Sequence, residues 1–141
     1  MEIKLDLESL KLIALFESVT RAEVKDCIAS EEKVIFVVNK GQAGAAIGEK
    51  GENIQRLREM LRRSVEIVEW AEVVEQFVRN IFHNFKVSEV KIEKRNNRNT
   101  AIVTVDPDQK ARAIGKQGKN LHAACEILQR HYKEVERILI A

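Results

Sequence analysis

The sequence contains few of the residues on which several classes of protein depend. In 141 residues it has two cysteines, one proline and six glycines. Two cysteines, Cys27 and Cys125, exclude a disulfide framework and a zinc knuckle. The longest apolar run, residues 34–38, is far shorter than the ~20 residues that span a bilayer, and residues 1–6 lack the basic and apolar pattern of a secretion signal. We therefore expect an intracellular, cytoplasmic protein with no membrane segment.

The net charge of +2 is too small to identify a partner, but the two halves of the chain differ. Residues 1–70 carry 11 basic and 13 acidic side chains, a net charge of −2. Residues 71–141 carry 13 basic and 9 acidic side chains, a net charge of +4. If the partner is a nucleic acid, the second half has the stronger general attraction for it.

The chain repeats itself. When residues 34–70 are placed over residues 101–137, an offset of 67, 13 of the 37 positions are identical. The densest part places residues 46–54 over residues 113–121, and a short match upstream places residues 23–25 over residues 89–91 at an offset of 66. Because no Pro/Gly/Ser-rich linker separates the copies, we expect two small domains, residues 1–70 and 71–141, in a fixed arrangement.

Hydrophobic periodicity predicts the same element order in both copies: helix, strand, strand, helix, helix, strand, an α+β fold. Leu7, Leu10, Ile13 and Ala14 recur at helical spacing and indicate the first helix. Asp106, Pro107 and Gln109 have the pattern of a capped helix start. The first copy is predicted to have helices at 6–20, 42–47 and 51–63 and strands at 22–29, 34–38 and 65–68. The second is predicted to have helices at 71–85, from Pro107 and from Gly118, and strands at 87–94, 100–105 and 135–140, with a polar turn at 95–99.

Each copy carries Ile-Gly-x-x-Gly between its short and its long helix. We call residues 48–51 the first loop and residues 115–118 the second loop. Glycine allows a sharp turn and the close approach of another backbone, and the helix that follows begins with unpaired N–H groups that suit phosphate oxygens. The pattern fits neither a P-loop nor a dinucleotide fingerprint. The alternative is that the glycines serve packing alone.

Basic residues surround both loops. Lys50, Arg56, Arg58, Arg62 and Arg63 follow the first, and Lys110, Arg112, Lys116 and Lys119 lie around the second. We expect Lys116 and Lys119 to contact phosphate, whereas the arginines of the first copy could equally be an ordinary solvated helix face. Because Glu49 should repel phosphate, we expect the second loop to contribute more affinity. Lys94, Arg95 and Arg98 could be an accessory contact or only a polar turn.

Base recognition is expected in an apolar groove beside each loop, lined by Ile47, Ile54, Ile114 and Leu121, although Ile54 and Leu121 also fit core positions. Aromatic residues make up only 5% of the chain, so stacking platforms are not expected to dominate.

The element order with Ile-Gly-x-x-Gly resembles the type II KH domain, which has a three-stranded mixed sheet packed on helices. The tandem pair is similar to the archaeal form of the transcription termination/antitermination factor NusA, through residues 44–48, 66–82 and 113–121. The resemblance implies binding of one extended single-stranded RNA, with RNA polymerase or a transcription complex as a further partner and no cofactor. Bacterial members also carry a polymerase-binding domain and an S1 domain, and neither pattern is found in this sequence. Carried onto this chain, the resemblance and the basic residues together assign RNA contact to Gly48, Glu49, Lys50, Gly51, Arg112, Ile114, Gly115, Lys116, Gln117, Gly118 and Lys119.

Three alternatives remain open at this point. One is a ribosome-associated or RNA-processing KH protein, and another is a module that binds only protein. The third is an enzyme, with candidates Cys27, Cys125, His83, His122 and His131. No spacing of these residues suggests a metal site, and Cys125 fits a buried structural thiol beside Leu121 and Leu128. The sequence therefore favours a non-catalytic RNA-binding protein without metal, cofactor or small-molecule substrate.

Overall fold

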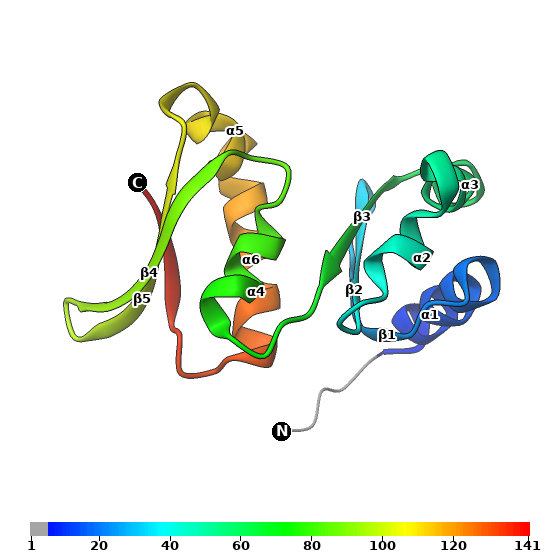
Figure 1. Ribbon diagram of the computed structural model, residues 1–141, viewed down its shortest axis with the longest axis horizontal. Helices are drawn as coiled ribbons and strands as arrows, with labels where there is room; N and C mark the ends of the chain where they lie inside the picture. The colour runs from blue at the N-terminus through cyan, green and yellow to red at the C-terminus, as the bar shows by residue number, and fades with distance from the viewer. Residues whose placement is uncertain (1–5) are drawn as a thin grey trace. The chain divides into compact units, whose positions relative to one another are not determined.

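The computed structural model describes residues 6–141, which divide into two compact units with the boundary along the chain between Ala71 and Glu72. Each unit is a layer of helices on a three-stranded sheet (Figure 1). No helix within the described range is long and apolar enough to cross a membrane. The expected absence of a secretion signal concerns residues 1–6, and all of these except Asp6 lie outside that range.

The first unit has the element order expected from the sequence. In its sheet, β2 lies in the middle, antiparallel to β1 and parallel to β3, so the sheet is mixed. The elements are α1 (Leu7–Thr20), β1 (Val24–Ala29), β2 (Lys33–Val38), α2 (Ala43–Ile47), the 3₁₀ turn η1 (Glu49–Gly51), α3 (Glu52–Leu61) and β3 (Ser64–Glu69).

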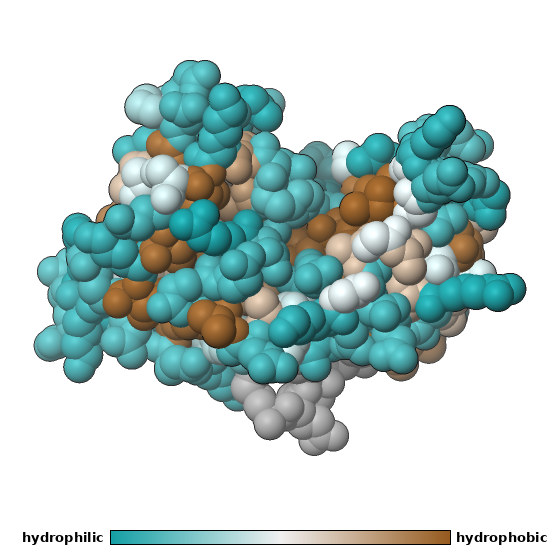
Figure 2. All heavy atoms as spheres, in the orientation of Figure 1, coloured by the Kyte–Doolittle hydropathy of each residue, from teal (hydrophilic) through white to brown (hydrophobic). Residues whose placement is uncertain are grey.

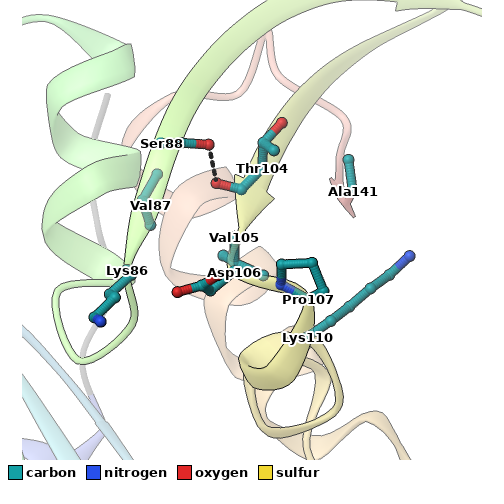
Figure 3. A pocket seen from close by; sticks show the side chains of 9 residues that line it. All are labelled: Lys86, Val87, Ser88, Thr104, Val105, Asp106, Pro107, Lys110 and Ala141. Atoms are coloured by element: carbon teal, nitrogen blue, oxygen red, sulfur yellow. Dashed lines mark hydrogen bonds between the residues drawn. The ribbon is translucent and has the colours of Figure 1, made fainter.

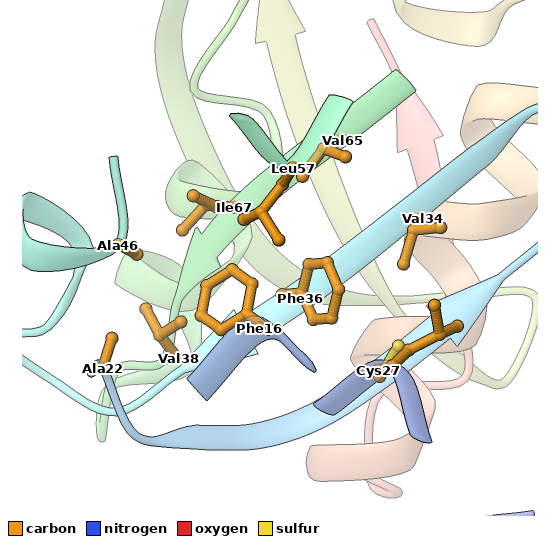
Figure 4. Packing of buried hydrophobic residues seen from close by; sticks show 11 residues of the cluster. Phe16, Ala22, Cys27, Val34, Phe36, Val38, Ala46, Leu57, Val65 and Ile67 are labelled. Carbon is orange, nitrogen blue, oxygen red and sulfur yellow. The ribbon is translucent and has the colours of Figure 1, made fainter. Parts of the chain in front are cut away.

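The core of the first unit lies between the sheet and its helices. Phe16 of α1 and Phe36 of β2 meet at a centroid distance of 4.2 Å, and Leu57 of α3 joins them (Figure 4). The α1 helix is confirmed, but the spacing of its apolar residues did not identify its buried face. Leu7 and Leu10 are 68% and 51% exposed. The buried face is instead formed by Ser9, Leu12, Phe16 and Thr20.

The second unit repeats the architecture with longer strands and a longer last helix. Its middle strand, β5, is antiparallel to β4 and parallel to β6. The elements are α4 (Val74–Ile81), β4 (Val87–Arg95), β5 (Arg98–Val105), the 3₁₀ turn η2 (Pro107–Gln109), α5 (Lys110–Ile114), the 3₁₀ turn η3 (Lys116–Gly118), α6 (Lys119–His131) and β6 (Arg137–Ile140).

Three predicted elements of the second unit were too long. One is the last strand, which was predicted from residue 135 and begins at Arg137. The α4 helix begins at Val74, because Val73 is still extended, and it ends at Ile81, after which residues 82–85 form turns. The predicted five-residue turn at 95–99 contains only Asn96 and Asn97. Both have positive φ, 51° and 65°, as a two-residue hairpin turn of type I′ requires.

The two units align less simply than the sequence repeat suggested. Strand pairing makes Cys27, opposite Phe36, equivalent to Val90, opposite Val103, an offset of 63. The match of residues 23–25 with residues 89–91 was therefore wrong. The offset of 67 holds from β2 to the first turns of α3 and becomes 73 at the last strand, where Val65 corresponds to Ile138. The β4–β5 hairpin is four residues longer than β1–β2, and six further residues separate the loop from the last strand.

The predicted capping box at Asp106 is also wrong. Asp106 is the N-cap residue of η2 and Pro107 its first residue, as predicted, but the Asp106 side chain forms no capping hydrogen bond. The Gln109 side chain instead accepts a hydrogen bond from the backbone N–H of Lys86 at 2.6 Å, and Gln42 accepts one from Glu23 at 3.4 Å. In each unit this glutamine connects the start of the first strand to the start of the short helix, which carries the Gly-x-x-Gly loop at its far end.

Candidate nucleic-acid interface

The first and second loops have almost the same backbone conformation. The leading glycines, Gly48 and Gly115, have φ/ψ of 81°/168° and 83°/166°. Lys50 and Gln117 both have φ 57° and ψ 24°, and the trailing glycines have φ of 75° and 73°. Each loop is closed by a hydrogen bond from the trailing glycine N–H to the leading glycine carbonyl, at 3.1 Å and 3.0 Å.

The leading glycine is required for two reasons. Its backbone conformation is essentially restricted to glycine. A Cβ at Gly48 would lie 2.9 Å from the backbone N of Asn53, and a Cβ at Gly115 would lie 2.8 Å from that of Asn120. Packing with the next helix therefore fixes this position as strictly as the turn does.

An asparagine holds each loop against the short helix, a role that the sequence analysis missed. Asn120 donates its side-chain amide to the Ala113 carbonyl at 2.7 Å, and Asn53 donates to the Ala45 carbonyl at 2.9 Å. The sequence feature that could have revealed this role is an asparagine two residues after the trailing glycine in both copies.

The loop opens directly onto the N-terminus of the long helix in both units. Gly51 and Gly118 precede α3 and α6, and neither helix has a side-chain capping bond. The first N–H groups of a helix and its dipole favour an anion at this point. The arrangement is therefore suited to a phosphate of an RNA backbone.

The two loops differ in charge at two equivalent positions. Glu49 in the first loop corresponds to Lys116 in the second, and Glu52, the first residue of α3, corresponds to Lys119, the first residue of α6. The acidic pair suits the positive end of the α3 dipole, whereas a lysine at the start of α6 costs about 0.3–1 kcal/mol. An anion bound at the second loop would offset that cost, and the side chains of Lys116 and Gln117 in that loop are exposed.

An open hollow adjoins the second loop. Asn84, Phe85, Ala111, Arg112, Gly115 and Lys116 line it. The Arg112 guanidinium lies 5.7 Å from the centroid of the Phe85 ring. This contact holds a positive charge beside the loop.

A second hollow lies where β4 begins and η2 follows β5 (Figure 3). Val87, Val105 and Pro107 supply apolar walls, and Lys86 and Lys110 lie on opposite sides. Asp106 also lines this hollow, so its two lysines are partly offset by one carboxylate.

Only some of the residues expected to line the base-recognition groove are exposed enough to contact a base. Ile47 is 41% exposed and Ile114 is half-buried. Ile54 packs against the core of the first unit, as its alternative assignment predicted. The neighbouring strands β3 and β6 are outer strands that contact α2 and α5, so their outer edges can offer backbone groups to a base.

Two of the four arginines after the first loop are engaged elsewhere. Arg56 pairs with Glu52 at 3.4 Å and Arg63 with Glu8 at 3.3 Å. Arg58 and Arg62 are exposed. The first loop therefore has less positive charge around it than its arginine count suggested.

The cysteines and histidines considered as catalytic candidates are spread over separate parts of the two units. Cys27 is buried in the first core, and burial raises the pKa of the Cys125 thiol, which disfavours the reactive thiolate. The His131 ring packs edge-on against Phe77, while His83 and His122 are exposed. Within residues 6–141, no three His, Cys, Asp or Glu side chains gather in a way that could hold a metal ion.

Comparisons with known proteins agree with this geometry. A KH-domain model matches residues 12–74, and a model described as the NusA-like second KH domain matches residues 74–137. The chain is 37% identical to the probable transcription termination protein NusA of Methanococcus vannielii, over 92% of this chain and 75% of that one. It is 38% identical to the protein of the same name from Halobacterium salinarum, over 94% of both chains. The crystal structure of APE1850 superposes with a TM-score of 0.76 at 36% identity, over 97% of this chain and 100% of that one.

The molecule is a tandem KH-domain protein of the RNA-binding class. Among such proteins, the chain belongs to the NusA-like family of archaeal transcription termination proteins. The expected fold is thereby confirmed: two tandem KH domains, each with a mixed three-stranded sheet packed on helices.

Proposed function

We propose that this protein acts in transcription termination by binding the backbone of single-stranded RNA at its two Gly-x-x-Gly loops. Each loop holds about four nucleotides, as KH domains do, and one RNA strand occupies both. The contact residues are those expected from the sequence, with Ile114 against a base: Gly48, Glu49, Lys50, Gly51, Arg112, Ile114, Gly115, Lys116, Gln117, Gly118 and Lys119. Association with RNA polymerase or the transcription complex is part of the same proposal.

One observation carries the proposal. In the second unit, lysines replace acidic residues at the N-terminus of α6, where a helix prefers negative charge. Lys116 lies in the loop and Lys119 in the first turn of α6, and Arg112 lines the same hollow as Gly115 and Lys116. Because this arrangement opposes the helix dipole unless an anion is present, its chemistry points to phosphate.

The test replaces Lys116 and Gln117 with Asp in the full chain. Both side chains are exposed, and Asp tolerates the left-handed conformation of Gln117. Circular dichroism should therefore show an unchanged fold. Affinity for a 15-nucleotide single-stranded RNA should fall about 100-fold, and the slope of log affinity against log salt should decrease by about 0.7 for each phosphate that the variant no longer binds. Unchanged RNA affinity would refute phosphate binding at the second loop.

A second experiment addresses the process in which the RNA is bound. Crosslinking in cells should recover nascent transcripts near their 3′ ends. Recovery of ribosomal RNA alone would support the alternative of a ribosome-associated KH protein and refute the role in termination.

A further inference from the structure

The β4–β5 hairpin differs from its counterpart in the first unit in both length and charge. It is four residues longer, and its last pair is Arg95 opposite Arg98. The β1–β2 hairpin ends at the pair Ala29 and Val34, and its tip, residues 30–33, contains two glutamates and one lysine. Residues 93–100 contain one glutamate and three basic residues.

The arginine pair is not needed for the turn. Asn96 and Asn97 adopt the left-handed conformations that the tight turn requires. This turn places Arg95 and Arg98 directly opposite each other, and like charges at such positions destabilise a hairpin. Arg95 is partly neutralised by Glu93, at 2.9 Å. Lys94 and Arg98 are exposed and form no ion pair with any residue between 6 and 141.

A third arginine lies on the same face of the sheet. Arg137 of β6 is paired with Thr100 of β5, and its Nε donates to the Thr100 hydroxyl at 3.1 Å. Thr100 is two residues from Arg98, so Arg95, Arg98 and Arg137 share a face, opposite the one on which Ala101 and Val103 enter the helical core. The nearby Glu136 carboxylate accepts the Asn99 N–H.

We propose that this hairpin surface, formed by Arg95, Arg98 and Arg137 on one face of the sheet, is an additional binding site for the phosphate backbone of RNA, separate from both loops. The proposal rests on the RNA-binding function proposed above. Arginine suits phosphate because its planar group donates two parallel hydrogen bonds. Figure 2 shows hydrophilic side chains over this hairpin end, at the lower left.

The composition of the hairpin favours RNA over a protein partner. Residues 93–99 are Glu, Lys, Arg, Asn, Asn, Arg and Asn, without an apolar side chain. Protein interfaces are usually centred on buried aromatic or aliphatic anchors. A surface of cations and amides without such an anchor suits a polyanion.

The hairpin surface and the second loop lie at opposite ends of the same sheet. The turn precedes β5, and η2 and α5, which lead to the loop, follow its other end (Figure 1). The eight residues of β5 span about 25 Å, at about 3.3 Å per residue. A five-nucleotide RNA with four nucleotides in the loop leaves only one, which cannot reach the hairpin, whereas a 15-nucleotide RNA can reach it.

The length of the RNA therefore provides the test. Arg95→Gln/Arg98→Gln in the full chain should weaken binding of a 15-nucleotide single-stranded RNA about 5- to 10-fold, and the salt slope should decrease by about 1.4 if two phosphates are no longer bound. Binding of a five-nucleotide RNA should not change. Lys11→Gln/Arg21→Gln removes the same charge from exposed positions of the first unit and should change either affinity less than twofold.

The outcomes separate this inference from the proposed function. If the hairpin variant binds the 15-nucleotide RNA with unchanged affinity and salt slope, the inference is overturned. The proposed function stands in that case provided that Lys116→Asp/Gln117→Asp still loses affinity for both RNAs. If the hairpin variant keeps the long RNA but loses binding to a polyglutamate peptide, the surface is a site for acidic protein and the inference is equally wrong.

Discussion

The first and second loops have nearly the same backbone but different charges. Their leading glycines differ by 2° in φ, and the residues before their trailing glycines have equal φ and ψ. Lysines nevertheless occupy the positions in and directly after the second loop that correspond to Glu49 and Glu52 in and after the first. Over residues 48–52 and 115–119 the net charges are −1 and +2.

This difference shows that the shape of the loop and its charge depend on different residues. The glycines, together with Asn53 and Asn120, determine the shape. The charges play no part in that packing, because they are exposed. The loop can therefore keep its backbone while its charge changes, and the proposal that this charge governs phosphate binding can be tested by changing one set of residues at a time.

The largest expected effect comes from two separate variants, in each of which one loop is changed to Gly-Asp-Asp-Gly. Lys116→Asp/Gln117→Asp should lower RNA affinity about 100-fold, about 2.7 kcal/mol, while Glu49→Asp/Lys50→Asp should lower it about fivefold, because the first loop already repels phosphate. Fluorescence anisotropy with a 15-nucleotide RNA measures both. Equal losses would show that the charge difference between the loops does not govern binding.

The next effect separates the two glycines of the second loop. Gly115→Ala should destabilise the protein by about 2 kcal/mol, because the conformation excludes a side chain and the new Cβ would lie 2.8 Å from the Asn120 backbone. Gly118→Asn should cost less than about 1 kcal/mol, because asparagine tolerates φ near 73° and no atom lies within 4 Å. Urea denaturation of the full chain measures both. A comparable cost for the two substitutions would contradict the packing role of the leading glycine.

A smaller gain is expected from Glu49→Lys. Placing a lysine at the position equivalent to Lys116 should raise RNA affinity about fivefold, about 1 kcal/mol, and steepen the salt dependence. The matched control is Glu31→Lys, the same charge change at an exposed hairpin position of the same unit. If both substitutions raise affinity equally, the gain reflects net charge and not a phosphate in the first loop.

The sequence alone predicted the order of the elements and the position of both loops. Strong local signals account for this: the apolar run of β2, the hairpin in the second half and Ile-Gly-x-x-Gly between helices. The buried face of α1 could not be predicted, because apolar residues surround that helix and Leu7 and Leu10 compete with Leu12 and Phe16. Which face of α1 is buried depends on the packing of Phe16 against Phe36 of β2, an interaction between residues far apart in the chain.

Identical residues also gave the wrong equivalence between the units at their ends. Strand register depends on turn length and on which side chains enter the core. Because the β4–β5 hairpin is longer, Val24 is structurally equivalent to Val87 and not to Val90, with which the sequence match had aligned it. Gln109 likewise looked like part of a capping box, yet its side chain accepts from Lys86, which lies 23 residues away. In both cases a partner distant in sequence determined the outcome.

The smallest expected difference concerns Asn53 and Asn120. Asn120 donates to the carbonyl of Ala113, which is fully buried, whereas Asn53 donates to the carbonyl of the exposed Ala45. Removing a partner of a buried carbonyl costs more, because water cannot replace it. We therefore expect Asn120→Ala to lower the free energy of unfolding by about 1.5 kcal/mol and Asn53→Ala by about 0.5 kcal/mol.

A merely structural asparagine would change stability alone, so RNA affinity should be measured as well. If Asn120 positions the second loop, Asn120→Ala should weaken RNA binding several-fold under conditions in which circular dichroism shows a fully folded chain, while Asn53→Ala should change binding less than twofold. Unchanged RNA affinity of the folded Asn120→Ala variant would mean that the glycines alone maintain the loop, and that the asparagine contributes only to stability.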